Sequence, residues 1–305
     1  MNVLKIGDSG ISIYWLRKSL NYIESINLSS SNHFDDELED AISRFQSNNG
    51  LLVDGEVGIF TIGKLSDSYI RIIKSNYGDS NGLIKRDKAP ADKFKNGYES
   101  FNLRGDVADA ARQVYNVLKT KGAILTSAGG FREISTKATD SSMSKSSLHY
   151  TGRALDMAVS SGMENPRTDP YIITSDDGLG RNGNRLHRVY AKSDIGDEMT
   201  LTPITYDKPL GAVKLTDKFV DLTKIMLDHG FERIKAKSRF YDTQNFSTSD
   251  RYKHAEWWHF QYQIGLFHGH STFGNELELV WLKTQLEKTE TWQSSKSFVF
   301  GVNWG

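Results

Sequence analysis

The sequence Ser147-Leu148-His149-Tyr150-Thr151-Gly152-Arg153-Ala154-Leu155-Asp156 places a histidine and an aspartate seven residues apart. A second run, Glu256-Trp257-Trp258-His259, adds another histidine and another carboxylate. Together the two runs supply two imidazoles, one carboxylate ligand and one spare carboxylate. Two imidazoles and one carboxylate can hold a catalytic zinc ion and leave its fourth position for water. The two runs therefore predict an open zinc site.

The first run also predicts local structure. Residues from about 153 to 159 alternate as a strand does, with His149 in the turn before it. One face of this strand is apolar, whereas on the other face Asp156 has only alanines beside it. We expect that face to leave room for a metal ion, because a buried aspartate needs a cation or hydrogen-bond donors.

The second run is rich in aromatic residues, which favours a strand over a helix. Three residues apart on a regular strand, Glu256 and His259 would point to opposite faces. For both to reach one site, Glu256 must lie before the strand or at a bulge. We therefore predict a break in the strand beside His259.

Composition limits the classes of function. The chain has 305 residues, with 38 basic and 38 acidic side chains, so a nucleic-acid footprint is not expected. Cysteine is absent, which excludes disulfides and a thiolate zinc site. We expect neither a signal peptide nor a membrane span, because no basic and apolar leader and no long apolar run occurs. The sequence therefore predicts cytoplasmic synthesis.

The N-terminal residues predict a small helical domain. Apolar side chains recur at helical spacing over residues 11–23, which predicts a first helix. Asp35 can cap a second helix. A third short helix is predicted at residues 61–65, and residues 70–73 can extend it. The segment contains the following residues in order: Gly7-Asp8-Ser9-Gly10, Leu16, Leu20, Phe34-Asp35, Ala41, Phe45-Gln46, Gly50-Leu51, Asp54-Gly55, Val57-Gly58, Thr61 and Leu65. In this pattern it resembles the three-helix peptidoglycan-binding module of cell-wall hydrolases. It implies a cell-wall glycopeptide ligand for residues 1–69.

The remaining chain predicts an α+β domain over 98–305, with a central antiparallel sheet and flanking helices. Residues 70–97 are polar and rich in turns, so we expect a linker there. Residues 160–212 are predicted to be an insertion that forms a polar flap. Further elements are expected as follows: a helix capped by Asp106, a strand at 123–127, a helix at 216–229, a strand at 231–234 and a last helix at 275–286.

The chemical residues of this second domain resemble those of zinc D-Ala-D-Ala carboxypeptidases and dipeptidases, and of phage L-alanyl-D-glutamate endopeptidases. The resemblance rests on the Ser147–Asp156 and Glu256–His259 runs and on Phe131-Arg132. It implies Zn²⁺ held by the following ligands: His149, Asp156 and His259. It also implies that Glu256 is the general base, that Arg132 stabilises charge on the scissile carbonyl and that Ser147 contacts substrate. His254, two residues before Glu256, is ranked below it as a functional residue. It could orient a zinc ligand through a hydrogen bond, or act as an alternative acid or base.

These inferences predict a peptidoglycan hydrolase with a zinc-dependent peptidase activity on the stem peptide. The expected bond is that between L-Ala and D-Glu, as in an endolysin or a phage tail-associated lysin. Such a protein would act at the bacterial cell wall, either after release that depends on a holin or as a virion component. One alternative is a D-Ala-D-Ala carboxypeptidase. Another is a non-catalytic wall-binding or virion structural protein with a structural zinc.

Overall fold

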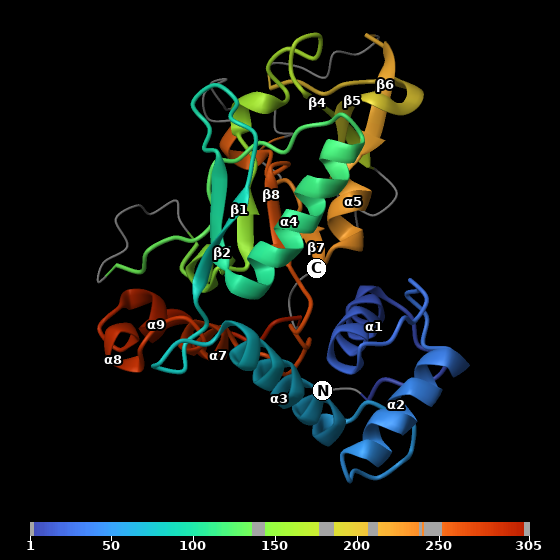
Figure 1. Cartoon of the computed structure of the whole chain (residues 1–305), viewed down its shortest axis with the longest axis vertical. Helices are drawn as coiled ribbons and strands as arrows, with labels where there is room; N and C mark the ends of the chain where they lie inside the picture. Colours follow the sequence, from blue (N-terminus) through green and yellow to red (C-terminus); the bar gives the residue numbers. More distant parts are fainter. Residues whose placement is uncertain are drawn as a thin grey trace. The chain divides into compact units, whose positions relative to one another are not determined.

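The computed structural model describes residues 3–135, 144–176, 186–206, 213–237, 240 and 252–301 (Figure 1). The described residues confirm the α+β class, since three N-terminal helices precede a mixture of sheets and helices. The chain forms two compact units: Met1–Lys85 with Glu133–Thr151 and Gln263–Gly305, and Arg86–Arg132 with Gly152–Tyr262. No described helix has the length and apolar character needed to cross a membrane.

The first unit contains the three predicted helices: α1 (Ile11–Glu24), α2 (Asp36–Asn48) and α3 (Ile59–Tyr77). The Asp35 carboxylate accepts a hydrogen bond from the Leu38 amide, so the predicted cap of α2 is confirmed. The core of this three-helix segment consists of apolar residues at helical spacing, among them Ile13, Trp15, Leu16, Leu20, Leu38, Ile42, Phe45, Ile62 and Leu65. Burial of this shared apolar face holds the short helices together.

The C-terminal residues belong to the same unit as these helices. The Gly265 amide donates to Ser19 Oγ on α1 at 2.9 Å, and Gly265 also faces the Tyr69 ring of α3. Three short helices follow: α7 (Phe273–Glu278), α8 (Lys283–Leu286) and α9 (Glu290–Ser295). The prediction of a single helix at 275–286 is therefore wrong, because α7 ends at Glu278 and α8 begins only at Lys283. The residues after α9 return to α7, where the Phe273 amide donates to Phe298 O.

The second unit begins with a hairpin and a helix. Strands β1 (Arg86–Pro90) and β2 (Ser100–Arg104) pair antiparallel, and α4 (Gly105–Thr120) packs beside them (Figure 1). The segment expected to be a linker thus contains the end of α3 and all of β1. The predicted helix is present, but Arg104 rather than Asp106 is its N-cap residue. Asp106 instead forms a buried ion pair with Arg104, with Oδ1 2.7 Å from Nε.

The sheet that carries the second unit's metal-ligating candidates has the order β3 (Ala154–Asp156), β8 (His259–Tyr262) and β7 (Phe231–Arg233). Both strand pairs are antiparallel.

The prediction of a regular strand at residues 123–127 is wrong. In this segment Thr126 and Ser127 make only isolated bridges, to Asp92 and Tyr98 respectively.

A second antiparallel sheet has the order β4 (Tyr171–Asp176), β5 (Leu186–Leu201) and β6 (Leu215–Asp221). The described residues of the segment expected to be a polar flap, 160–212, form β4 and β5, and Ile172 and Leu201 pack with Phe219 of β6 in a buried core. Its role as an insertion that forms a flap stays a prediction. The helix predicted at 216–229 is wrong in its first half. Residues Leu215–Asp221 pair with β5, and only α5 (Leu222–Asp228) is helical.

A buried histidine of this sheet predicts how stability depends on pH. Burial lowers the pKa of His187 from 6.5 to about 4, and its Nδ1 lies 2.9 Å from Ala255 O. Between these pH values the unfolded chain therefore binds more protons at this residue than the folded chain does. Acidification from pH 7 to 4 should remove roughly 3 kcal/mol of unfolding free energy through His187.

This loss is measured as the difference between the wild type and His187→Gln in urea unfolding at several pH values. The exposed His33 supplies the matched control, since His33→Gln should keep the wild-type pH dependence. Equal pH dependence in His187→Gln and wild type would contradict the prediction.

Candidate metal centre

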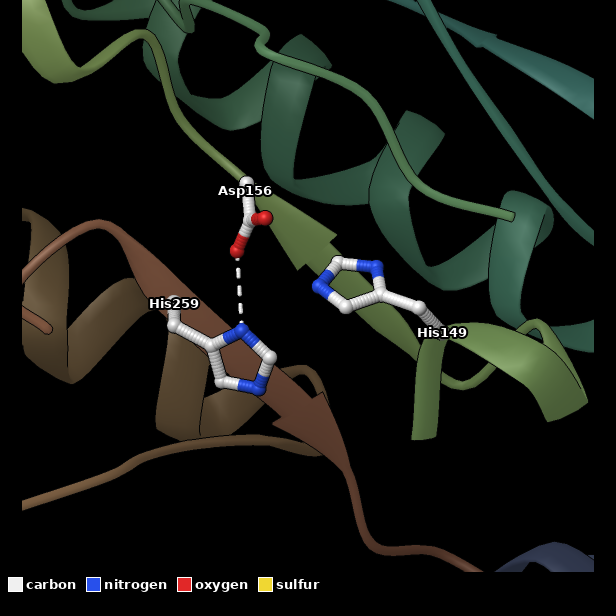
Figure 2. Close-up of side chains that lie close together, drawn as sticks. All are labelled: His149, Asp156 and His259. Carbon is white, nitrogen blue, oxygen red and sulfur yellow. Dashed lines mark hydrogen bonds and ion pairs between the residues drawn. The ribbon is translucent and has the colours of Figure 1, made fainter. Parts of the chain in front are cut away.

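Strand pairing brings two of the predicted ligands together. In the register of β3 and β8, Asp156 lies directly opposite His259. Opposite residues of an antiparallel pair point to the same face of the sheet. His259 Nδ1 lies 2.8 Å from Asp156 Oδ1, and Figure 2 marks this contact with a dashed line. The two side chains are largely buried, with 10% and 20% of their surfaces exposed.

His149 comes from a separate turn, the 3₁₀ helix Leu148–Thr151, and is 3% exposed. Two hydrogen bonds fix this turn. The Thr151 hydroxyl donates to Leu148 O at 2.8 Å, and Trp281 Nε1 donates to Tyr150 O at 2.7 Å. The imidazole ring of His149 points toward the Asp156 carboxylate and the ring of His259 (Figure 2).

The three side chains offer ligand atoms that all lie within 4.8 Å of one another. Around a tetrahedral zinc with bonds of 2.0–2.1 Å, ligand atoms are about 3.3 Å apart. Closing the group around an ion therefore needs side-chain shifts of about 1 Å. Two imidazoles and one carboxylate also form an appropriate donor set for zinc. The group fits a metal ion, and its composition does not by itself fix which ion.

Glu256 lies in the turn that precedes β8. The His259 amide donates to Glu256 O at 3.3 Å, and Glu256 has a left-handed φ of 54°. The predicted break in the strand is therefore confirmed. A turn of this kind keeps its first and fourth residues within about 7 Å at Cα. Among the described residues, the clustered ligand group comprises His149, Asp156 and His259 and does not include Glu256, whose role as base stays a prediction.

The Glu256 carboxylate is 14% exposed and forms an ion pair with Lys237, whose Nζ lies 3.0 Å from Oε1. The Lys237 amide also donates to His254 O at 2.9 Å. His254 ends a short 3₁₀ helix, Tyr252–His254, directly before this turn. The predicted role of His254 stays a prediction.

The two residues predicted to contact substrate, Arg132 and Ser147, each follow or precede a segment that carries a candidate ligand or pairs with one. The Asp156 amide donates to Gly129 O at 2.9 Å, which places the glycine turn leading to Arg132 along β3. Arg132 itself is partly buried. Ser147 is partly buried directly before the His149 turn, where its carbonyl accepts from the Tyr150 amide at 3.1 Å. The contacts of these two residues with substrate stay predictions.

Two residues near the cluster were not singled out by the sequence analysis. Lys237 lies in a polar loop that gives no signal of a site. Gln261 is 6% exposed, and its Nε2 lies 3.0 Å from His259 Nε2. Strand alternation could have identified Gln261, because it lies two residues after His259 and on the same face.

Comparison with known proteins supports the N-terminal assignment. Residues 9–65 match a family described as "Putative peptidoglycan binding domain". The match covers α1, α2 and the start of α3, and it supports peptidoglycan as a partner and association with the cell wall. No curated protein matches the chain.

The cluster predicts that the wild-type protein binds one divalent metal ion, for which zinc is the probe. At a free zinc concentration one hundred times Kd, binding should raise the unfolding free energy by about 2.7 kcal/mol. Asp156→Asn removes a charged ligand and should weaken zinc binding more than about 100-fold, beyond the usual effect of losing an outer hydrogen bond. Competition with a chromogenic chelator measures the affinity.

The exposed Asp197 provides the control, because Asp197→Asn removes the same charge away from the cluster. This variant should bind zinc as the wild type does. Equal affinity in Asp156→Asn and Asp197→Asn would show that the cluster is not the zinc site.

Proposed function

We propose that this protein is a zinc-dependent peptidoglycan hydrolase that cleaves a peptide bond in the stem peptide. The observation that carries the proposal is the approach of His149, Asp156 and His259 within 4.8 Å, in a chain whose residues 9–65 match a peptidoglycan-binding domain. The carboxylate of Glu256, one turn before a ligand, adds a group of the kind that such a hydrolysis needs.

A zinc ion held by the three ligands would lower the pKa of a bound water toward neutrality and polarise the scissile carbonyl. Glu256 would accept a proton from the attacking water and pass one to the leaving amine. The ion pair with Lys237 holds this carboxylate in place. Arg132 would stabilise negative charge on the carbonyl oxygen, a contribution typically of a few kcal/mol.

The proposed substrate bond is that between L-Ala and D-Glu, because the Ser147–Asp156 and Glu256–His259 runs resemble those of phage L-alanyl-D-glutamate endopeptidases. In this proposal the protein is a phage lysin, and its N-terminal module raises the local concentration of stem peptides around the metal centre. Digestion of purified peptidoglycan, followed by mass spectrometry of the products, tests the bond. New N-terminal D-Glu would support the endopeptidase, and release of D-Ala would favour the carboxypeptidase alternative.

Glu256→Gln keeps the size of the side chain and removes the base. We expect it to retain zinc and wall binding and to lower kcat/KM on peptidoglycan by about 10²–10⁴-fold. The exposed Glu287 supplies the matched control, Glu287→Gln, which should have wild-type activity. Unchanged turnover in Glu256→Gln would rule out its role as base. Absence of turnover in the zinc-loaded wild type would favour the non-catalytic alternative.

Exposed apolar side chains also gather within the matched module. Leu52 and Phe60 are 79% and 82% exposed, and Val53 and Ile59 are each 54% exposed. Large exposed apolar groups in one short segment are typical of a binding surface. We propose that residues 52–60 contact the wall.

Phe60→Ser should therefore reduce the fraction of protein that sediments with purified cell walls. It should change the unfolding free energy by no more than about 0.5 kcal/mol, because the side chain is exposed. Ile195→Ser, at a residue 67% exposed and outside the module, is the control and should sediment normally. Equal sedimentation of both variants and wild type would remove residues 52–60 from the wall-binding surface.

A further inference from the structure

The imidazole ring of His259 is held from both sides within the β3–β8 sheet. Its Nδ1 lies 2.8 Å from Asp156 Oδ1, and its Nε2 lies 3.0 Å from Gln261 Nε2. His259 and Gln261 share one face of β8, since they are two residues apart. Gln261 lies opposite Ala154, whose small side chain leaves room for the amide. The ring therefore presents Nδ1 to Asp156 and Nε2 to Gln261.

This arrangement decides which nitrogen can hold a metal ion. Nδ1 is on the side of Asp156, the second ligand, whereas Nε2 is covered by the Gln261 amide. A neutral imidazole carries one proton, and the nitrogen that binds a metal must be the other one. Coordination through Nδ1 thus requires a proton on Nε2, and that proton requires an acceptor.

Gln261 can provide this acceptor. Its Oε1 is buried, and among the residues that the structure describes it has no hydrogen-bond partner. A half-turn of the amide exchanges its oxygen and nitrogen and brings Oε1 to the position facing His259 Nε2. The amide can therefore donate to Nε2 when the ring proton is on Nδ1, and accept from it when the proton is on Nε2.

We propose that Gln261 is a positioning residue of the metal centre, whose amide oxygen accepts the His259 Nε2 proton and so keeps Nδ1 available as a ligand. In the metal-free protein Nδ1–H donates to Asp156 and the amide nitrogen donates to Nε2. In the metal-bound protein the proton lies on Nε2 and the amide is reversed. Hydrogen bonds from the second nitrogen of ligating histidines commonly orient the ring and raise its basicity.

This inference rests on the proposed metal centre, and zinc affinity measured by chelator competition tests it without any activity assay. Gln261→Met keeps the length and volume of the side chain but removes the acceptor, so Kd for zinc should rise about 10–100-fold. Gln261→Glu keeps an acceptor oxygen and should bind zinc at least as tightly as the wild type. Urea unfolding of the metal-free variants checks that both are folded.

A second measurement uses only the wild type. Histidine-selective ¹⁵N labelling and two-bond ¹⁵N–¹H spectra should show His259 protonated on Nδ1 without zinc and on Nε2 with zinc. A zinc-loaded His259 that remains protonated on Nδ1 would overturn the inference. So would equal zinc affinity of Gln261→Met and the wild type. A wild type that binds no zinc would instead overturn the metal centre itself, and the inference with it.

Discussion

The pairing of β3 with β8 is the constraint on which the candidate site depends. It sets Asp156 opposite His259 although the two residues are 103 positions apart in the chain. A shift of this register by one residue would turn one of the two side chains to the opposite face of the sheet. The apolar neighbours Leu155 and Phe260 prevent such a shift, because both are fully buried on the other face. The core of this sheet thus fixes the register that brings the proposed ligands together.

The parts of the fold that the sequence predicted are those determined by local chemistry. The Asp35 cap depends on residues three positions apart. The strand predicted over 153–159 is present only as Ala154–Asp156, because a 3₁₀ helix begins at Val159. The break at Glu256 likewise follows from strand geometry, whereas the assignment of His149, Asp156 and His259 as ligands came from the resemblance to zinc peptidases. The pairing of Gly129 with Asp156, three residues before Arg132, is a long-range backbone contact that no local pattern reveals.

Tertiary context explains where sequence reasoning failed. Residues 216–221 have apolar spacing that a helix also allows, but pairing with β5 makes them a strand. Aspartate is a residue type that commonly caps helices. The carboxylate of Asp106 instead forms an ion pair with the buried guanidinium of Arg104. Lys237 lies in a polar loop without a distinctive motif, and Gln261 lies on β8 two residues after His259. Their contacts with Glu256 and His259 became visible only through the fold.

The left-handed backbone of Glu256 has a consequence for how this chain can change. A residue other than glycine, asparagine or aspartate is strained at such φ values, typically by about 1 kcal/mol or more. Glycine at position 256 would relieve that strain and also delete the carboxylate. Selection for heat tolerance alone would therefore favour loss of this residue. Under the function proposed above, glutamate at position 256 would keep the base at the cost of this strain.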